Sequence, residues 1–313
     1  MKVAQIGFGR WGKNIYNTLK SINQIDDIYV FDPLLNSDSN LNLLSLEEII
    51  NSKEIETVFI VTPATTHFEL TKTFLESNKN VFCEKPLCFN LSQVNEIENI
   101  INLTKKTFIS GHTFLFNDTL DFVKNYIDEK KPQFKTVSGK YCSFGTNISD
   151  IDVLWDFGPH VVSISNYIFN SKPNQISVLP ISYNNDGRLE SCILHLVYGK
   201  TNVIYELSWI SIKKKREIEF NGYKTLIKWS DVDVDRPIEI YEKEANDKLD
   251  PGVYAHYHNI PNSIFTPPIS PKEPLSNELR YFVENSMKKE YKNLKSGIEF
   301  TKEVIETLEL AHF

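Results

Sequence analysis

Three short segments of this chain carry residues whose types and spacing could do chemistry. They are the glycine turn Gly7-Phe8-Gly9-Arg10-Trp11-Gly12, the tripeptide Glu84-Lys85-Pro86, and the hexapeptide Trp155-Asp156-Phe157-Gly158-Pro159-His160. A glycine turn of this kind can hold a pyrophosphate. An imidazole, whose ordinary pKa is close to neutrality, can accept or donate a proton. These segments suggest proton transfer near a bound nucleotide, provided that the surrounding elements position them for it.

The glycine turn matches the pattern G-x-G-x-x-G. Its first glycine permits the tight turn, the second lets the backbone approach an anion, and the third lets a helix pack closely on a strand. Such glycines can also be purely structural. Here a strand-like run, Val3–Gly7, leads into the turn and a helical pattern follows from Trp11, which is the context that a dinucleotide site requires. We therefore expect the six residues Gly7, Phe8, Gly9, Arg10, Trp11 and Gly12 to bind the cofactor.

Asp32 follows the second strand-like run, Ile28–Phe31, and precedes Pro33. A carboxylate at this place can accept hydrogen bonds from ribose hydroxyls and would repel a 2′-phosphate. No arginine or lysine follows it closely, so the sequence predicts NAD in preference to NADP. The alternative is a solvated aspartate that begins a turn.

Two further loops follow strand-like runs, at the sheet edge where ligands bind in open α/β proteins. Thr62 and Pro63 come after the third run, and Glu84 and Lys85 come after the fourth. We expect all four to contact the cofactor. His67, near the start of the next helix, is predicted either to contact the cofactor or to hydrogen-bond the helix end.

Asp156 and His160 are spaced to lie one turn apart on one helix face if the helix begins at Asp156 or just after it. Pro159 would then stand in the first turn, where its missing N–H is no loss. The alternative is that Asp156 only caps the helix and His160 is a half-buried structural residue.

The first part of the chain alternates short apolar runs with helical patterns, which predicts a parallel sheet with crossover helices. Capping boxes are expected at Ser45 with Glu48 and at Thr66 with Glu69. The predicted strands are Val3–Gly7, Ile28–Phe31, Thr57–Val61, Asn80–Cys83 and Thr107–Ser110, with helices beginning near Trp11, Leu46, His67 and Ser92. This pattern indicates an α/β Rossmann domain over residues 1–115.

After Lys130 the pattern changes to one helix, near Trp155–Phe169, and then consecutive strands. Hairpin turns at 184–187 and 198–200 predict an antiparallel sheet. We expect an α+β domain over 116–313 with a largely antiparallel, open-faced sheet, a proline-rich surface loop at 250–274 and two closing helices, the last of which packs back on the first domain. The predicted strands are Gln175–Tyr183, Glu190–Tyr198, Asn202–Ile210, Arg216–Phe220 and Thr225–Trp229, and the predicted closing helices are Asn277–Met287 and Ser296–Ala311.

Composition narrows the class of protein. The 313 residues exceed the usual size of one hydrophobic core, and a net charge of −7 argues against a nucleic-acid partner. A strand-like run starts at Val3, which leaves no room for a signal peptide, and no stretch reaches the ~20 apolar residues of a membrane span. We expect a cytoplasmic protein with no membrane partner.

Cysteines, lysines and histidines outside these motifs have plainer interpretations. The four cysteines show no C-x-x-C spacing, so free thiols in a reducing compartment are expected. The cluster at 213–216, Lys-Lys-Lys-Arg, is interpreted as a solvated strand edge. No metal site is expected, and His256 and His258 in the proline-rich loop are interpreted as surface residues or as part of a loop that shapes specificity.

The order and spacing of the motifs resemble the Gfo/Idh/MocA oxidoreductases over nearly the whole chain. The resemblance rests on the glycine turn, Thr62-Pro63 with His67, Glu84-Lys85-Pro86, and Asp156-x-x-x-His160. It implies that Lys85, Asp156 and His160 serve the catalytic site, and that the peptide before Pro86 is cis. It also suggests a homodimer or homotetramer.

Physical chemistry agrees with that assignment. Oxidation of a secondary alcohol needs a base for the hydroxyl proton, and His160 can serve as that base, or as an acid in the reducing direction. Asp156 would orient the ring or bind a neighbouring hydroxyl, and the charge of Lys85 would stabilise a developing alkoxide. We expect Lys85 and His160 to converge on one site; the alternative for Lys85 is a surface lysine.

The substrate is predicted from looser similarities. Gly111-His112-Thr113-Phe114-Leu115-Phe116-Asn117, Trp209, and Glu273-Pro274-Leu275 with Glu278 resemble the branch of the family that acts on nucleotide-linked sugars. Substrate contacts are predicted at His112, Tyr141, Trp155 and Trp209, although buried aromatic residues more often belong to a core. The leading hypothesis is an NAD-dependent oxidoreductase for a sugar hydroxyl or ketone in surface polysaccharide synthesis. The alternatives are a free-sugar or inositol-type dehydrogenase and a non-catalytic dinucleotide sensor.

Overall fold

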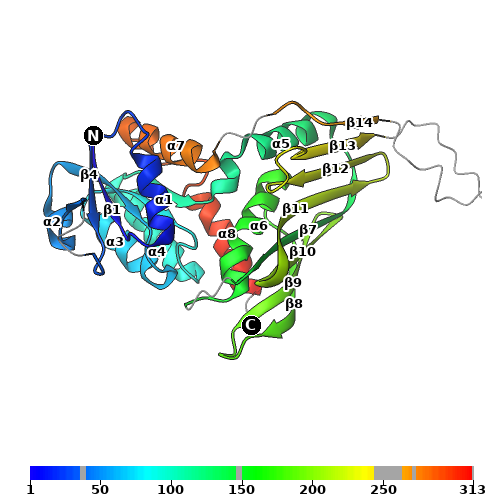
Figure 1. Cartoon of the computed structure of the whole chain (residues 1–313), viewed down its shortest axis with the longest axis horizontal. Coiled ribbons are helices and arrows are strands. Elements are labelled where there is room, and N and C mark those ends of the chain that lie inside the picture. Colours follow the sequence, from blue (N-terminus) through cyan, green and yellow to red (C-terminus); the bar gives the residue numbers. More distant parts are fainter. Residues whose placement is uncertain (36–39, 146–149, 243–262, 270–272, 312–313) are drawn as a thin grey trace, which may run out of the picture. The chain divides into compact units, whose positions relative to one another are not determined.

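The computed structural model describes residues 1–35, 40–145, 150–242, 263–269 and 273–311. The chain forms two compact units (Figure 1). Unit 1 comprises Met1–Phe116, Ser149–Ile151 and Glu273–Phe313, and unit 2 comprises Asn117–Ile148 and Asp152–Lys272. The segment from Glu273 onward, which the sequence suggested as part of the second domain, therefore belongs to unit 1 by its contacts.

Unit 1 is built on a six-stranded, wholly parallel sheet in the order β3-β2-β1-β4-β5-β6. The sheet order reverses at β1, where β2 lies on one side and β4 on the other. In such sheets ligands bind beyond the carboxyl ends of the strands at this reversal, so a ligand of unit 1 is expected at the loops after β1, β4 and β5. The strands are β1 Lys2–Ile6, β2 Asp27–Phe31, β3 Asn42–Leu43, β4 Ile55–Ile60, β5 Asn80–Glu84 and β6 Phe108–Gly111.

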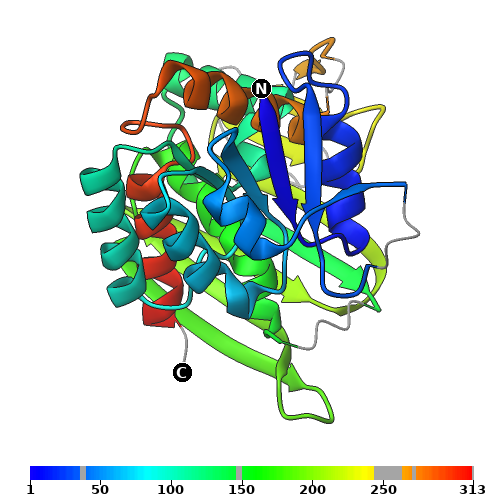
Figure 2. The ribbon, with the colours of Figure 1, turned by 90° about the vertical axis from the view of Figure 1, so that its left-hand side faces the viewer.

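Helices connect and cover these strands (Figure 2). Each predicted helix is present, and its start lies within one residue of the predicted position. The connecting elements are α1 Arg10–Leu19, α2 Leu46–Asn51, the 3₁₀ turn η1 Ala64–Thr66, α3 His67–Glu76, α4 Leu91–Thr104 and the 3₁₀ turn η2 Thr113–Phe116. The α/β interpretation of this half is confirmed.

Capping boxes were predicted at the starts of two helices, and only one of them is present. At α2, the Ser45 hydroxyl accepts from the Glu48 backbone N–H and the Glu48 carboxylate accepts from the Ser45 N–H, so this capping box is confirmed. At α3, the Thr66 side chain makes no capping bond. Its hydroxyl instead bonds the Pro63 carbonyl oxygen at 2.8 Å and the Thr62 hydroxyl at 2.6 Å. The second capping box was therefore wrong, because η1 already orders the chain before the helix.

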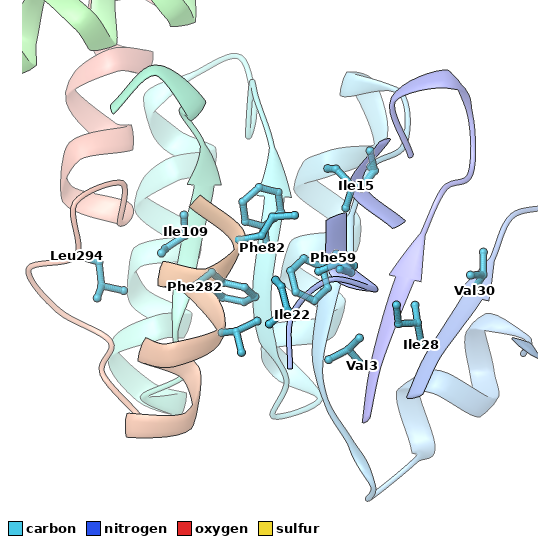
Figure 3. Close-up of a cluster of buried hydrophobic side chains, with 14 residues drawn as sticks. Val3, Ile15, Ile22, Ile28, Val30, Phe59, Phe82, Ile109, Phe282 and Leu294 are labelled. Carbon is cyan, nitrogen blue, oxygen red and sulfur yellow. The ribbon is translucent and has the colours of Figure 1, made fainter. Parts of the chain in front are cut away.

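The end of the chain completes unit 1. Helix α7, Pro274–Lys288, contacts α1, and α8, Ile298–Ala311, contacts α4 and β6. Phe282 of α7 packs edge-on against Phe59 of β4, with ring centroids 5.3 Å apart (Figure 3). The core cluster therefore joins the first strands to a helix that lies more than 200 positions later in the chain. Its members are Val3, Ile15, Leu19, Ile22, Ile28, Val30, Phe59, Val61, Phe82, Ile109, Leu279, Phe282, Val283 and Leu294.

Unit 2 contains an eight-stranded sheet in the order β14-β13-β12-β11-β7-β10-β9-β8. All neighbouring strands are antiparallel except β7 and β10. The predicted hairpins β8–β9 and β9–β10 are present, and the largely antiparallel α+β interpretation is confirmed. The strands are β7 Phe134–Phe144, β8 Gln175–Tyr183, β9 Leu189–Tyr198, β10 Thr201–Ser208, β11 Ile210–Gly222, β12 Thr225–Ser230, β13 Ile238–Glu242 and β14 Ser263–Phe265.

Two helices pack on this sheet: α5, Asp118–Lys130, contacts β12, and α6, Val153–Phe169, contacts β9 and β10 (Figure 1). The sequence did not predict α5, β7, β13 or β14. Strand β7 is central, yet polar residues interrupt its apolar alternation, and only its pairing with β10 and β11 reveals it. β14 lies inside the predicted 250–274 loop, most of which is outside the described residues.

The lysine cluster was placed wrongly. Lys213, Lys214, Lys215 and Arg216 belong to β11, which lies between β12 and β7 and is not an edge strand. Pairing with β7 shifts register between Ile210 and Lys215, and pairing with β12 begins only at Glu217. The lysines therefore lie on an irregular end of an interior strand, where Lys213 and Lys214 remain exposed.

Within the described residues, no helix combines the length and the apolar character that a membrane crossing requires.

Candidate active site

The glycine turn between β1 and α1 is closed by contacts that leave no space for side chains at two of its glycines. Gly7 has a φ of +96°, and a Cβ there would lie 2.4 Å from the Val61 carbonyl oxygen. A Cβ at Gly12 would lie 2.6 Å from the Gly7 carbonyl oxygen. The buried Gln5 amide, which the sequence reasoning missed, donates to the Gly7 and Gly12 carbonyl oxygens at 2.8 and 2.9 Å. The turn is thus rigid before any ligand arrives.

Gly9 differs from the other two glycines. It has an ordinary φ of −67°, and a Cβ built there would meet nothing within 4 Å. Helix α1 begins at the next residue with no side-chain cap and no acidic residue in its first turn. The first N–H groups of a helix attract anions when no cap satisfies them. Gly9 and the exposed Arg10 therefore border a surface that fits the pyrophosphate of a dinucleotide.

Asp32, at the end of β2, reaches back to this turn. Its Oδ2 accepts a hydrogen bond from the Phe8 backbone N–H at 2.6 Å, and its Oδ1 accepts from the Leu34 N–H at 2.9 Å. A carboxylate has about four acceptor positions, so two bonds leave it able to accept from ribose hydroxyls. Residues 36–39 that follow lie outside the described part of the chain. The free acceptor positions of the Asp32 carboxylate therefore fit the hydroxyls of an adenosine ribose.

His67 ties the loop after β4 to the loop after β5. Its Nδ1 lies 2.8 Å from the Pro86 carbonyl oxygen, and its Nε2 lies 2.9 Å from the Thr62 carbonyl oxygen. The ring is buried, and burial lowers its pKa. Of the two predicted roles, the structure shows hydrogen bonding, directed at the two loops that flank the helix start.

Glu84 and Lys85 end β5, and the Lys85–Pro86 peptide is cis, as predicted. The Glu84 carboxyl is buried, and its Oε1 accepts from the Trp11 indole N–H at 2.6 Å. Its Oε2 accepts from the Lys85 backbone N–H at 3.3 Å. Burial raises the pKa of Glu84, while the bond from Trp11 opposes that rise. Trp11 and Glu84, both predicted to contact the cofactor, are thus in contact with each other.

A second buried polar group lies at the end of β6. His112 is 1% exposed, and burial and then the Lys85 charge lower its pKa to about 3, so the ring is neutral. Neither ring nitrogen has a hydrogen-bond partner among the described residues. Nearby, Glu278 of α7 accepts from the Thr113 hydroxyl at 2.8 Å, and burial raises its pKa well above the ordinary value. A neutral imidazole with one donor and one acceptor can recognise a polar ligand without charge.

In unit 2, helix α6 carries the predicted Asp156 and His160. The helix begins at Val153, earlier than expected, and Asp152 caps it by accepting from the Trp155 N–H at 2.9 Å. Asp156 is therefore not the cap, and Pro159 lies inside the helix, so the prediction that it stands in the first turn was wrong. Proline has no N–H to donate back to the carbonyl four residues earlier, here that of Trp155.

Asp156 is buried and holds one of the predicted aromatic residues. Its Oδ2 accepts from the Trp209 indole N–H at 3.0 Å. This bond joins α6 to the end of β10 and fixes the carboxylate, since an ionised group in such a position needs donors. Trp155 is also buried, at 5% exposure, which is compatible with a packing role.

His160 is half-buried and stacks on Tyr141 of β7, with ring centroids 5.2 Å apart and planes 20° apart. The Arg216 guanidinium lies over the ring of the same tyrosine, 5.0 Å from its centroid, and pairs with Asp231 at 3.2 Å. Burial raises the pKa of the Tyr141 phenol, so it stays protonated. Sequence reasoning treated Arg216 only as a member of the charged cluster. The available signal was that successive residues of a strand point to opposite faces of the sheet, so Arg216 and Lys215 cannot share one face of β11.

The structure thus brings together two sets of predicted residues, one in each unit. Unit 1 gathers the glycine turn, Asp32, Thr62, Glu84 and Lys85 at the carboxyl ends of its strands. Unit 2 gathers Asp156, His160, Tyr141 and Trp209. The convergence of Lys85 and His160 on one site stays a prediction.

The remaining candidate groups are unremarkable. Cys83, Cys88, Cys142 and Cys192 are free and buried, and burial raises the pKa of each thiol. Within the described ranges, no three His, Cys, Asp or Glu side chains gather as a metal site. His256 and His258 lie outside the described residues.

Comparison with known proteins supports this description. Residues 1–112 match the family model GFO_IDH_MocA, described as an oxidoreductase family with an NAD-binding Rossmann fold. An uncharacterized oxidoreductase of Streptococcus pneumoniae is 25% identical over 135 residues, which are 41% of this chain and 36% of that protein. The chain spans about a third of the length of the first curated relatives it matches.

Two solved structures share the fold along nearly the whole chain. A UDP-N-acetylglucosamine 3-dehydrogenase from Acidithiobacillus ferrooxidans has a TM-score of 0.80 at 13% identity, covering 98% of this chain and 95% of that one. A 3-ketoreductase from Actinomadura kijaniata, in complex with TDP-benzene and NADP, has a TM-score of 0.81 at 12% identity, covering 99% and 96%. Residues 1–112 thus resemble the NAD-binding Rossmann part of the GFO_IDH_MocA oxidoreductase family, and the two solved structures show that the fold is shared along nearly the whole chain.

Proposed function

We propose that this protein is an NAD-dependent oxidoreductase that interconverts a hydroxyl and a ketone on a nucleotide-linked sugar, in surface polysaccharide synthesis. The observation that carries the proposal is the arrangement on α6. Asp156 and His160 lie one turn apart, and each is held by a predicted substrate residue, Trp209 and Tyr141. A carboxylate and an imidazole fixed in this way can bind and deprotonate a sugar hydroxyl.

His160 takes the hydroxyl proton in the oxidising direction and returns it in the reducing direction. Stacking on Tyr141 fixes the plane of the ring, which matters because proton transfer needs the donor and acceptor within hydrogen-bond reach. Asp156 keeps acceptor capacity beyond its bond from Trp209, so it can bind a hydroxyl next to the reacting carbon.

Lys85 supplies positive charge to the oxygen that becomes an alkoxide. The bond from its backbone N–H to Glu84 and the carbonyl contact of His67 to Pro86 hold the peptide on both sides. A bound nicotinamide dinucleotide supplies the hydride acceptor or donor. Residues that would hold it are the glycine turn, Asp32, Thr62 and Pro63.

NAD is the proposed cofactor because of Asp32. Its carboxylate faces the Phe8 N–H of the glycine turn, and a fixed negative charge at this place opposes a 2′-phosphate. A 3-ketoreductase with the same fold is solved with NADP, so the proposal of NAD for this chain rests on Asp32.

The nucleotide-linked sugar is proposed from two supports. One is the aromatic residues beside Asp156 and His160, and the other is the pair of structures with the same fold, a UDP-N-acetylglucosamine 3-dehydrogenase and a 3-ketoreductase bound to TDP-benzene. The four free thiols fit a reducing compartment such as the cytoplasm. A homo-oligomer is proposed on the family resemblance.

The test is turnover measured by NADH absorbance with a panel of UDP-sugars, TDP-sugars, free sugars and inositols, each with NAD and with NADP. We expect turnover with a nucleotide-linked sugar and NAD. Turnover with free sugars or inositols alone would favour the cyclitol-type dehydrogenase. Tight NAD binding without turnover on any compound would favour the sensor.

A further inference from the structure

We propose that Trp11 and Glu84 form a positioning pair that fixes the Lys85 peptide relative to the glycine turn. The inference rests on the proposed function, because it assigns to that reaction two residues whose sequence motifs suggested only cofactor contact. It concerns unit 1 alone. Neither residue is proposed to touch the reacting atoms.

The first argument is that Glu84 connects three elements of unit 1. Its Oε1 accepts from Trp11 at the start of α1, and its Oε2 accepts from the Lys85 N–H after β5. On a third side it packs on the end of β6: a Cβ at Gly111 would lie 2.8 Å from Oε2. These contacts hold the Glu84 carboxyl in one position, and its bond from the Lys85 N–H fixes the backbone of Lys85 relative to it.

The second argument is the exposure of Trp11. The indole is 44% exposed, whereas Glu84 is 8% exposed. A large aromatic ring that stays partly in solvent gains little free energy from packing. Packing alone therefore does not explain why the Trp11 indole N–H is placed 2.6 Å from the Glu84 carboxylate. The bond supplies a donor to a buried carboxylate, which would otherwise lack one at Oε1.

The third argument is the protonation state that the contacts select. Both Glu84 oxygens face N–H donors, an environment that favours the ionised carboxylate because it accepts and does not donate. The titratable groups around it are Lys85 next in the chain, Cys83 before it and Glu278 on α7. Burial raises the pKa of Glu84, and the bond from Trp11 is the largest effect that opposes this rise, followed by the Lys85 charge. Burial and then the charge of Glu84 raise the pKa of Glu278.

Trp11→Phe is the decisive substitution, because it keeps an aromatic ring and removes only the indole N–H. We expect turnover to fall roughly tenfold to a hundredfold, the size of effect that misplacement of a reacting group produces, with a smaller change in the KM for NAD. Loss of the donor raises the pKa of Glu84. When the pH is lowered, activity that requires the ionised carboxylate is therefore lost at a higher pH than in the wild type. The acid limb of the pH–rate profile should therefore move to higher pH.

Controls separate this effect from general damage. Trp229→Phe also removes an indole N–H donor, here to the Thr119 hydroxyl at 2.9 Å in unit 2, and should leave the acid limb in place. Glu84→Gln cannot ionise and should abolish the Glu84 contribution to that limb. The titration of His160 is common to wild type and Trp11→Phe, so the shift between them reports on Glu84. Because Trp11 is exposed, we expect its variant to keep the fold, and a thermal melt checks this.

A measurement independent of turnover distinguishes failure of the pair from failure of the proposed function. In full-length protein labelled with ¹⁵N at tryptophan and lysine, the Trp11 indole signal and the Lys85 amide signal should titrate with one shared midpoint, absent in Glu84→Gln. If no sugar is turned over but this shared midpoint is present, the proposed function fails and the pair stands. If Trp11→Phe leaves turnover and the acid limb unchanged, or the two signals do not titrate together, the pair is refuted.

Discussion

In unit 1 the groups expected to meet the cofactor sit on loops at the carboxyl ends of parallel strands, whereas in unit 2 the groups expected to meet the substrate sit on one helix and on the sheet beneath it. The loops of unit 1 are held by side chain–backbone hydrogen bonds, such as those of Gln5, Asp32 and His67. The helix residues of unit 2 are held by aromatic side chains, Tyr141 and Trp209.

The difference has a physical cause. A loop that binds a dinucleotide must present its own N–H groups, so its carbonyl oxygens need other partners, and buried polar side chains provide them. The backbone N–H and C=O groups of a helix are already hydrogen-bonded to one another. Its functional side chains therefore need only be oriented, which the stacking of Tyr141 on His160 and the indole N–H of Trp209 achieve. We therefore expect damage to the glycine turn or Asp32 in unit 1 to affect cofactor binding and stability, and damage to His160 in unit 2 to affect turnover.

The largest effect is expected from His160→Ala. Removing the proton acceptor should lower kcat by about 10²–10⁴-fold and leave the Kd for NAD nearly unchanged, because the glycine turn belongs to the other unit. Steady-state kinetics and calorimetric titration of NAD measure the two quantities. Unaltered turnover would remove His160 from the mechanism, and a parallel loss of NAD affinity would break the proposed division between the units.

Gly7→Ala should weaken both stability and cofactor binding. The residue has a positive φ, and its new Cβ would clash with the Val61 carbonyl oxygen, so we expect a loss of about 1–3 kcal/mol in the free energy of unfolding. Urea denaturation measures it. Gly9→Ala is the matched control: it has an ordinary φ and open space around the Cβ, so stability should be kept while NAD binding weakens. Equal destabilisation by both changes would contradict this interpretation of the turn.

Asp32→Ala should change cofactor preference more than turnover. Loss of one charge-assisted acceptor should weaken NAD roughly tenfold, while removal of the negative charge should help NADP. The ratio of kcat/KM values for the two cofactors is the relevant measurement. An unchanged ratio would show that another residue makes the selection.

Ile181→Lys should affect neither chemistry nor cofactor binding. Leu179, Ile181 and Tyr183 of strand β8 are 61%, 58% and 56% exposed, and large apolar side chains grouped on a strand often mark a contact surface. If the expected homo-oligomer forms through this surface, the variant should show a smaller mass in size-exclusion chromatography with light scattering. Leu103→Lys, at an 82% exposed position of α4, should leave the mass unchanged. The same mass for Ile181→Lys and wild type would place the interface elsewhere.

Local patterns in the sequence were reliable where one short segment contains all the interactions that matter. The Ser45 capping box was predicted correctly because both of its partners lie within four residues. The Thr66 box failed because Thr62 and Pro63, which precede it, compete for the same hydroxyl. The start of α6 was placed late because Asp152 and Asp156 are both plausible caps, and only the fold shows which one accepts from the helix N–H.

The sequence by itself determined the glycine turn, five of the six parallel strands of unit 1 with the helices between them, the acid at the end of β2 and the spacing of Asp156 and His160, because each depends on neighbours along the chain. It missed the two-residue strand β3. Tertiary structure alone decided that β7 and β11 lie in the middle of a sheet, that Gln5 closes the turn, that Arg216 and Tyr141 meet near His160, and that Trp11 reaches Glu84. Those contacts join residues up to 75 positions apart. No local pattern encodes such a distance, since it depends on how strands pair and helices pack.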